Sequence, residues 1–345
     1  LLAAVQACNM SGIPISNSFD TIENPRLGII TGSLSGPTDS FIDYYENFYL
    51  KNKIHKYRTS VGETIMNSGV STFISGITGA AAFVLSTSNA CASGTEAIVL
   101  GYDSVKLGKA TQAIVGGYEA TSILSWSLYD SMRVLGSDSN HLPEKSSRPM
   151  NENVNGFIPA AGAGILILEE MEHAVSRGAT IYAEIVGGSI NNGAQRNGGT
   201  MSAPNCDATV RCIQDAIADA DIDMGEIDYL CGHLTSTMAD VLEIKNWAKA
   251  LNRYGTEFPL INSIKGMTGH CIGAAGAIET IAAILQMKES LVHPNVNCEP
   301  LHPEILKIID KKCIPLEPTI KEIKYCAKLS LGFGDANACL VLKKT

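Results

Sequence analysis

The stretch FVLSTSNACASGTEAIVLGYDSVKL, residues 83–107, predicts the fold class of this protein. Its apolar opening, residues 83–85, is typical of a buried strand, and the small and apolar residues after residue 91 recur at helical spacing. Cys91 therefore lies where a strand ends and a helix begins. Free N–H groups and the dipole of a helix start favour a thiolate, so we expect Cys91 to be a nucleophile near neutral pH. A small buried core cysteine is the alternative.

The composition fits a large, well-cored protein of one big domain or two fused halves, with 345 residues of which 45% are hydrophobic. A net charge of −9 argues against a nucleic-acid-binding surface. The ten cysteines form no C-x-x-C pair, and a chain of this size needs no disulfide framework, so we predict a cytoplasmic protein. Residues 64–95 carry no charge but contain no apolar run of membrane-spanning length. We predict that they are buried in protein, near a subunit interface.

Strands alternate with helices along the chain, which predicts an α/β fold with mostly parallel pairing. The expected strands are residues 26–33, 83–85, 112–119, 163–168, 181–188, 227–231 and 259–264. The expected helices are residues 1–10, a helix capped by Ser40, the helix after Cys91, and residues 171–177, 208–220, 238–251 and 269–287. The chain closes with KYCAKLSLGFGDANACLVLKK, residues 324–344, whose two apolar segments around a glycine-containing turn indicate a hairpin.

Two later segments each place a histidine after an expected strand. CGHLTSTMADVLE, residues 231–243, carries His233 with three hydroxyl residues beside it. INSIKGMTGHCIGAAGAIE, residues 261–279, carries Lys265 and His270, followed by glycines and alanines that make a closely packing helix face. A nearby lysine disfavours the imidazolium, so we expect a neutral His270. Taken singly, each segment also fits a structural histidine.

The segment LGFGDANACLV, residues 331–341, has glycines on both sides of Phe333. These glycines permit unusual backbone angles and free N–H groups to point at a substrate oxygen. A turn that merely requires glycine is the alternative.

Four of these motifs, NACASGTEAI, GHLTST, KGMTGH and GFG-x-x-NA, resemble in this order the β-ketoacyl-acyl-carrier-protein synthases, and the elongating type with a Cys-His-His triad is the most similar. The resemblance runs over essentially the whole chain. It implies a thiolase fold, in which two similar βαβαβαββ halves form a five-layered αβαβα sandwich, with the first strand missing from this sequence. Residues 1–170 would form the half that carries Cys91, and residues 171–345 the half that carries His233 and His270.

The resemblance also implies roles. Cys91 would take an acyl chain from acyl-carrier protein as a thioester, and His233 and His270 would support decarboxylation of malonyl-carrier protein and stabilise the enolate. Lys265 would tune His270, with Glu279 in the same network. The N–H groups of Cys91 and Phe333 would form the oxyanion hole, and Phe333 would gate the acyl pocket. The implied substrate-binding residues are Thr235 and Thr237, on the phosphopantetheine arm, with Phe333, Gly334 and Asn337.

The same resemblance implies that the reaction needs no metal ion or cofactor. The implied partners are acyl-carrier protein and a second copy of the chain in a homodimer, with neither nucleic acid nor a membrane. Several positions depart from the family's pattern, namely Asn89, Asn151, Asn155, Ala161, Leu234 and Asp335. Two alternatives stay open: a non-catalytic partner subunit that sets chain length in a heterodimer, and a Cys-His hydrolase. The sequence does not distinguish a fatty acid pathway from a polyene or polyketide pathway.

Overall fold

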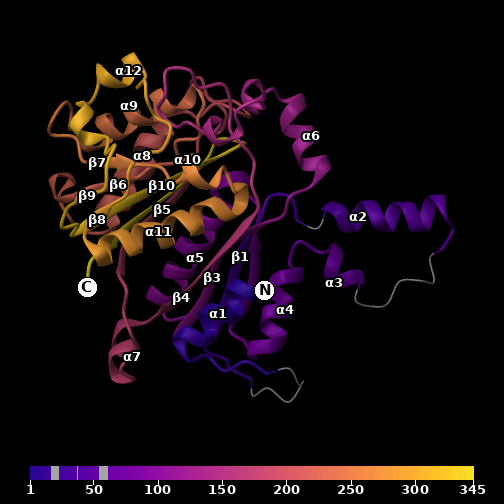
Figure 1. Cartoon of the computed structure of the whole chain (residues 1–345). Coiled ribbons are helices and arrows are strands. Elements are labelled where there is room, and N and C mark those ends of the chain that lie inside the picture. Colours follow the sequence, from indigo (N-terminus) through magenta and orange to yellow (C-terminus); the bar gives the residue numbers. More distant parts are fainter. Residues whose placement is uncertain (17–22, 37, 54–60) are drawn as a thin grey trace.

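A computed structural model describes residues 1–16, 23–36, 38–53 and 61–345, and within them the chain forms two large mixed sheets (Figure 1). The N-terminal sheet has the order β2-β1-β3-β4. Its strands are β1 (Leu27–Gly32), β2 (Phe83–Thr87), β3 (Gln112–Glu119) and β4 (Gly162–Glu169). β1 pairs in parallel with β2 and β3, and β4 is antiparallel to β3. β2 is therefore an edge strand.

The C-terminal sheet has the order β5-β11-β10-β6-β7. Its strands are β5 (Glu184–Asn192), β6 (Tyr229–Cys231), β7 (Leu260–Asn262), β10 (Tyr325–Gly332) and β11 (Ala336–Lys343). The predicted hairpin is confirmed, because β10 and β11 pair antiparallel with Gly332 opposite Ala336. β10, β6 and β7 run in parallel, so β6 and β7 end at the same edge of the sheet. A separate pair is formed by β8 (Leu291–Val292) and β9 (Thr319–Ile320).

Helices fill the space between the sheets and cover their outer faces. α5 (Ser93–Lys106) and α11 (Ala275–Glu289) contact each other and strands of both sheets, so they form the middle layer. α1 (Leu2–Ser11) and α4 (Gly69–Thr78) pack on the N-terminal sheet, and α8 (Cys206–Asp219) and α9 (Ala239–Leu251) pack on the C-terminal sheet. The expected five-layered αβαβα sandwich is therefore confirmed.

Shorter helices lie around this sandwich. They are α2 (Thr38–Tyr45), η1 (Glu46–Leu50), α3 (Val61–Ile65), α6 (Ile123–Ser131), α7 (Met171–Ser176), α10 (Lys265–Thr268) and α12 (Pro303–Leu306). Single 3₁₀ turns are η3 (Ala90–Ala92), η4 (Ser137–Ser139), η5 (Pro143–Lys145), η6 (Met224–Glu226), η7 (Ile272–Ala274) and η8 (Lys311–Cys313). Figure 1 shows α2 projecting away from the sandwich. In the part of the chain that is described, no helix has both the length and the apolar character that a membrane crossing requires.

The two middle helices, α5 and α11, approach closely at Gly94 and Gly276. This agrees with the closely packing face predicted for the glycine- and alanine-rich segment after His270. A Cβ on Gly276 of α11 would lie 2.1 Å from Thr95 Oγ1, and a Cβ on Gly94 of α5 would lie 2.7 Å from the carbonyl oxygen of Gly273. Neither distance is possible between real atoms, so these positions require glycine. Close packing brings the start of α5, and with it Cys91, against the start of α11.

Three sequence-based expectations are wrong in detail. Ser40 does not cap a helix, since α2 begins at Thr38 and Ser40 lies inside it. The helix expected from residue 269 begins only at residue 275, because the backbone of His270 is extended and exchanges hydrogen bonds with Ile158 and Ala160. The strand expected at residues 181–188 is displaced to residues 184–192, where it pairs with β11.

The uncharged stretch, residues 64–95, is only partly buried in the single chain. Met66, Phe73 and Leu85 are 46–50% exposed. Leu85 lies on β2, which has a strand neighbour on one side only, and Phe73 lies on α4. The prediction of burial is therefore not met within one chain.

Candidate active site

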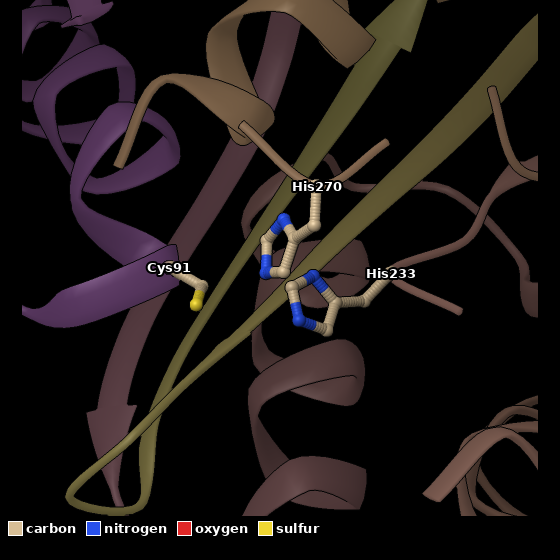
Figure 2. A group of neighbouring side chains, drawn as sticks. All are labelled: Cys91, His233 and His270. Atoms are coloured by element: carbon tan, nitrogen blue, oxygen red, sulfur yellow. The ribbon is translucent and has the colours of Figure 1, made fainter. Parts of the chain in front are cut away.

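Cys91, His233 and His270 come together at the carboxyl ends of strands from both sheets. Cys91 lies in η3 just after β2, His233 follows β6, and His270 precedes η7. The Sγ of Cys91 and one ring nitrogen of each histidine lie within 4.8 Å of one another, and the three residues are buried. Figure 2 shows the two imidazoles next to each other, facing the sulfur. The predicted meeting of one thiol with two imidazoles is confirmed.

The turn that carries Cys91 is fixed by short-range hydrogen bonds and by the neighbouring hairpin. Ser93 Oγ donates to the carbonyl oxygen of Ala90 at 2.7 Å and accepts from the N–H of Asn89 at 2.9 Å. Ala90 adopts a positive φ of 49°. A Cβ on Gly332, at the end of β10, would lie 2.5 Å from the Asn89 carbonyl oxygen. Gly332 thus lets the hairpin press directly on the turn of the nucleophile.

The thiol of Cys91 is protonated in the resting site, opposite to the prediction of a thiolate. Burial raises its pKa to about 12, and the smaller opposing effect of Lys265 does not offset this. A helix start stabilises the thiolate, but removing the sulfur from water destabilises the thiolate by more. All ten cysteines are free thiols, so Cys91 is not engaged in a disulfide. A group nearby must therefore accept its proton when it reacts.

The peptide group of His233 is held on both sides by buried charged residues. Glu243 of α9 accepts hydrogen bonds from the N–H groups of His233 at 2.6 Å and Leu234 at 2.7 Å. Lys265 Nζ donates to the carbonyl oxygen of His233 at 2.5 Å. Burial raises the pKa of Glu243 to about 7. Sequence reasoning missed Glu243, which lies in the quoted motif but ten residues beyond the histidine.

The ring of His270 has a defined neutral tautomer. Its Nδ1 accepts a hydrogen bond from the N–H of Ile272 at 3.3 Å, so in the neutral ring the proton sits on Nε2. The ring packs edge-on against Phe157 and His233, with centroids 5.3 Å away in both cases. Burial, followed by the charges of Lys265 and Lys328, holds the pKa of His270 well below 6.5. The expectation of a neutral His270 is confirmed.

A buried ionic network lies next to the two histidines. Glu279 of α11 binds Lys265 through Oε1, and its Oε2 lies 2.8 Å from Lys328 Nζ. All three side chains are at most 2% exposed. The pairing of Lys265 with Glu279 was expected from the sequence. Lys328 was missed, although a single lysine inside the apolar segment YCAKLSL is a detectable signal.

The predicted substrate-binding residues lie at two places around this centre. Phe333 packs in the apolar cluster of Cys91. Thr235 and Thr237 lie in the loop after His233, with their hydroxyl oxygens 3.0 Å apart. Gly334 donates its N–H to the Met201 carbonyl oxygen. Asn337 is fully buried; its amide oxygen accepts from Thr209, and its amide nitrogen donates to Asn191 and to the Asp335 carbonyl oxygen. Substrate contact by these five residues stays a prediction.

One thiol and two imidazoles could also serve as three ligands of a zinc ion. The surrounding charges do not fit this use. Lys265 and Lys328 act electrostatically on the imidazoles and would repel a cation. The Nε2 of His270 carries a proton in its neutral tautomer and is a donor, whereas a metal ligand must offer a lone pair. The residues are therefore better suited to stabilise negative charge.

Comparison with known proteins agrees with this geometry. Residues 1–174 match the model of the β-ketoacyl synthase N-terminal domain, and residues 182–299 match that of the β-ketoacyl synthase C-terminal domain. The chain belongs to the β-ketoacyl synthase family. It is 34% identical over 324 residues to 3-oxoacyl-[acyl-carrier-protein] synthase 1 of Escherichia coli, covering 93% of this chain and 76% of that protein.

Solved β-ketoacyl synthase structures share the fold along the whole chain. A β-ketoacyl synthase from Burkholderia phymatum superimposes with a TM-score of 0.86 at 29% identity, covering 100% of this chain and 81% of that one. A type II polyketide synthase ketosynthase, solved in complex with its acyl-carrier protein and bound to the hexaketide, superimposes with a TM-score of 0.86 at 28% identity, covering 100% and 84%. The family resemblance stated from the motifs is therefore confirmed.

Proposed function

We propose that this chain is a 3-oxoacyl-acyl-carrier-protein synthase that extends an acyl chain by decarboxylative condensation with malonyl-carrier protein. The observation that carries the proposal is the buried cluster of Cys91, His233 and His270 in a β-ketoacyl synthase fold. The relative from Escherichia coli is named for this activity. A complete set of thiol and imidazoles favours a catalytic synthase over a chain-length-determining subunit.

In the first half-reaction, the Cys91 sulfur attacks the thioester carbonyl of the acyl-carrier protein. Because the resting thiol is protonated, the sulfur must release its proton as the C–S bond forms. The same proton then passes to the departing phosphopantetheine sulfur. The products are an acyl-Cys91 thioester and the free thiol of the carrier protein.

In the second half-reaction, malonyl-carrier protein loses carbon dioxide. The electron pair of the broken C–C bond stays on the remaining carbon and forms an enolate. Neutral His270, with its proton on Nε2, donates a hydrogen bond to the enolate oxygen, and His233 is the second donor. The enolate carbon attacks the carbonyl of acyl-Cys91, and the Cys91 sulfur leaves as a thiolate that takes up one proton from solvent. The N–H groups of Cys91 and Phe333 stabilise the oxyanion during both attacks.

We assign the carrier-protein arm to the loop of Thr235 and Thr237 and the acyl pocket to the space behind Phe333. Residues 1–170 and 171–345 act as two halves that supply the nucleophile and the two imidazoles. Gly334 and Asn337 shape the hairpin turn that presents Phe333. The reaction, as written, needs no metal ion or cofactor.

A second copy of the chain is the partner that fits the edge strand β2. The exposed side of this strand carries an unpaired backbone edge, and Leu85 is half exposed. An exposed, apolar edge strand favours pairing with another strand. We propose a homodimer built on β2, which would also cover Phe73 of α4.

Mass spectrometry after incubation with acyl-carrier protein tests the proposal directly. The acyl mass should appear on the peptide of Cys91, and addition of malonyl-carrier protein should remove it and yield β-ketoacyl-carrier protein. Cys91→Ala is the matched control and should carry no acyl group. If Cys91 stays unmodified in folded protein incubated with carrier protein that bears an acyl chain, the proposal is refuted. Release of free fatty acid without a malonyl-dependent product would instead identify a hydrolase.

A further inference from the structure

Lys328 is a fully buried lysine on β10 that the predicted reaction does not use. Its Nζ lies 2.8 Å from Glu279 Oε2, donates to the carbonyl oxygen of Leu329, and lies 3.1 Å from Ser330 Oγ. Burial alone lowers the pKa of Lys328, but Glu279, together with Cys231 and Glu243, more than offsets this, so the pKa lies above its ordinary value. Lys328 therefore remains an ammonium group inside the protein, where an uncompensated charge is costly.

The network that contains Lys328 places two ammonium groups on the single carboxylate of Glu279, and the carboxyl group of Glu243 interacts electrostatically with both lysines from outside the network. The network reaches the site at two points. Lys265 donates to the carbonyl oxygen of His233, and Ser330 Oγ lies 2.8 Å from the hydroxyl of Thr95, one turn after Cys91 in α5. An ion pair with two cations is not needed to neutralise one glutamate, so the second ammonium group calls for another explanation.

We propose that Lys328 is a second positioning lysine of the condensing reaction, which holds Glu279 through its other carboxylate oxygen and keeps a second ammonium group close enough to act on the two imidazoles. This inference rests on the proposed function. Lys328 touches no substrate and acts through its neighbours. The positive charge opposes formation of imidazolium and favours the enolate, whose negative charge forms beside the imidazoles as the carboxylate is lost.

The electrostatic surroundings agree with this role. The other titratable or charged groups around the imidazoles are Cys91 from η3, Glu119 from β3, Cys231 from β6, Asp240 and Glu243 from α9, Lys265 from α10, Cys271 beside His270, and Glu279 from α11. Burial comes first among the causes that lower the pKa of His233, and the charges of Lys265, His270 and Lys328 follow. Lys328 is thus one of two lysines that act on both rings.

The test follows the imidazoles themselves. Protein labelled with ¹³C in its histidine rings is titrated by NMR, with His233→Asn and His270→Asn to assign the two buried rings. Lys328→Met removes the ammonium group at nearly constant side-chain length, and we expect the protonation equilibrium of at least one ring to shift about tenfold toward imidazolium. Ser330→Ala, which removes a neighbour of Lys328 but no charge, is the matched control and should leave both rings as in the wild type.

Kinetics give the second readout. Lys328→Met should lower kcat about tenfold with little change in the KM for malonyl-carrier protein, because only neighbours of the substrate are affected. The acidic limb of the kcat profile should move to higher pH, since the rings become protonated more readily. If the rings of His233 and His270 in folded Lys328→Met protonate at the same pH as in the wild type, the inference is overturned.

A second background keeps the test decisive if Lys328→Met does not fold. Glu279→Gln removes the carboxylate that pairs with Lys328. When Lys328→Met is added to this variant, the loss of the ammonium group therefore leaves no unpaired carboxylate at residue 279. Within this background, removal of Lys328 should again shift the rings toward imidazolium, and an unchanged titration would again overturn the inference. The titration uses enzyme without substrate. Failure of the proposed function would appear separately, as wild-type protein that makes no β-ketoacyl product.

Discussion

Replacing Glu243 by methionine should loosen the loop that carries His233. Glu243 accepts hydrogen bonds from the N–H groups of His233 and Leu234, and from the indole N–H of Trp247 at 3.3 Å. Methionine has a similar length and accepts hydrogen bonds only weakly. Three buried donors would then lack an acceptor.

The magnitude follows from two opposing contributions. Three unsatisfied donors at about 2 kcal/mol each lower the free energy of unfolding by about 6 kcal/mol. The wild type, however, must keep a buried carboxylate. Burial raises the pKa of Glu243 from 4.5 to about 7, so its ionisation costs the folded state about 3 kcal/mol at pH 7 and above. The net loss at pH 8 is therefore about 3 kcal/mol.

The loss should be larger in acid. Between pH 4.5 and 7 the folded state holds the proton of Glu243 whereas the unfolded state has released it, so the wild type loses stability as pH rises through this range. The variant lacks this group. The difference between them should consequently grow from about 3 kcal/mol at pH 8 to about 5 kcal/mol at pH 5.

Urea denaturation followed by circular dichroism at both pH values measures this difference. The kcat for condensation should also fall about 100-fold, since a displacement of His233 by about 1 Å misaligns the donor to the enolate. Glu304→Met, at an exposed glutamate of α12 paired with Lys307, is the matched control and should cost less than about 1 kcal/mol. Wild-type stability and kcat in Glu243→Met would refute the role given to this carboxylate.

Three further predictions concern the hairpin, the imidazoles and the loop of residues 193–205. Gly332→Ala places a Cβ 2.5 Å from the Asn89 carbonyl oxygen and should slow acylation of Cys91 about 100-fold, as measured by quenched-flow mass spectrometry. His270 is buried with a pKa below that of the unfolded chain, so acid below pH 6.5 should destabilise the wild type relative to His270→Asn by about 1.4 kcal/mol per pH unit, read from denaturation curves. Asp335→Ala removes the acceptor of the Asn205 N–H at 2.7 Å and should cost about 2 kcal/mol while making residues 193–205 more sensitive to limited proteolysis.

The departures from the family's motifs show how much a pattern can and cannot say. Asp335 stands where the motif has glycine, and the structure gives it a positive φ of 67° and two N–H partners, those of Gln195 and Asn205. Asn151 stands where the family has an acid, and its amide nitrogen donates to the carbonyl oxygens of Asn297 and Glu299. Both residues serve the folding of nearby loops, and neither belongs to the cluster of Cys91 and the two histidines.

The resemblance of four motifs to the β-ketoacyl synthases implied that Cys91, His233 and His270 meet. Local patterns in the sequence determined the order of the main strands and helices and the strand-to-helix turn that carries Cys91. These features depend on periodicity, turn chemistry and glycines at contacts, which are recorded locally along the chain. Only the tertiary structure decided the protonation of Cys91, the hold of Glu243 on His233 and the presence of Lys328 in the ionic network. Desolvation and charge depend on what surrounds a group after packing, and those neighbours come from segments far apart in the chain.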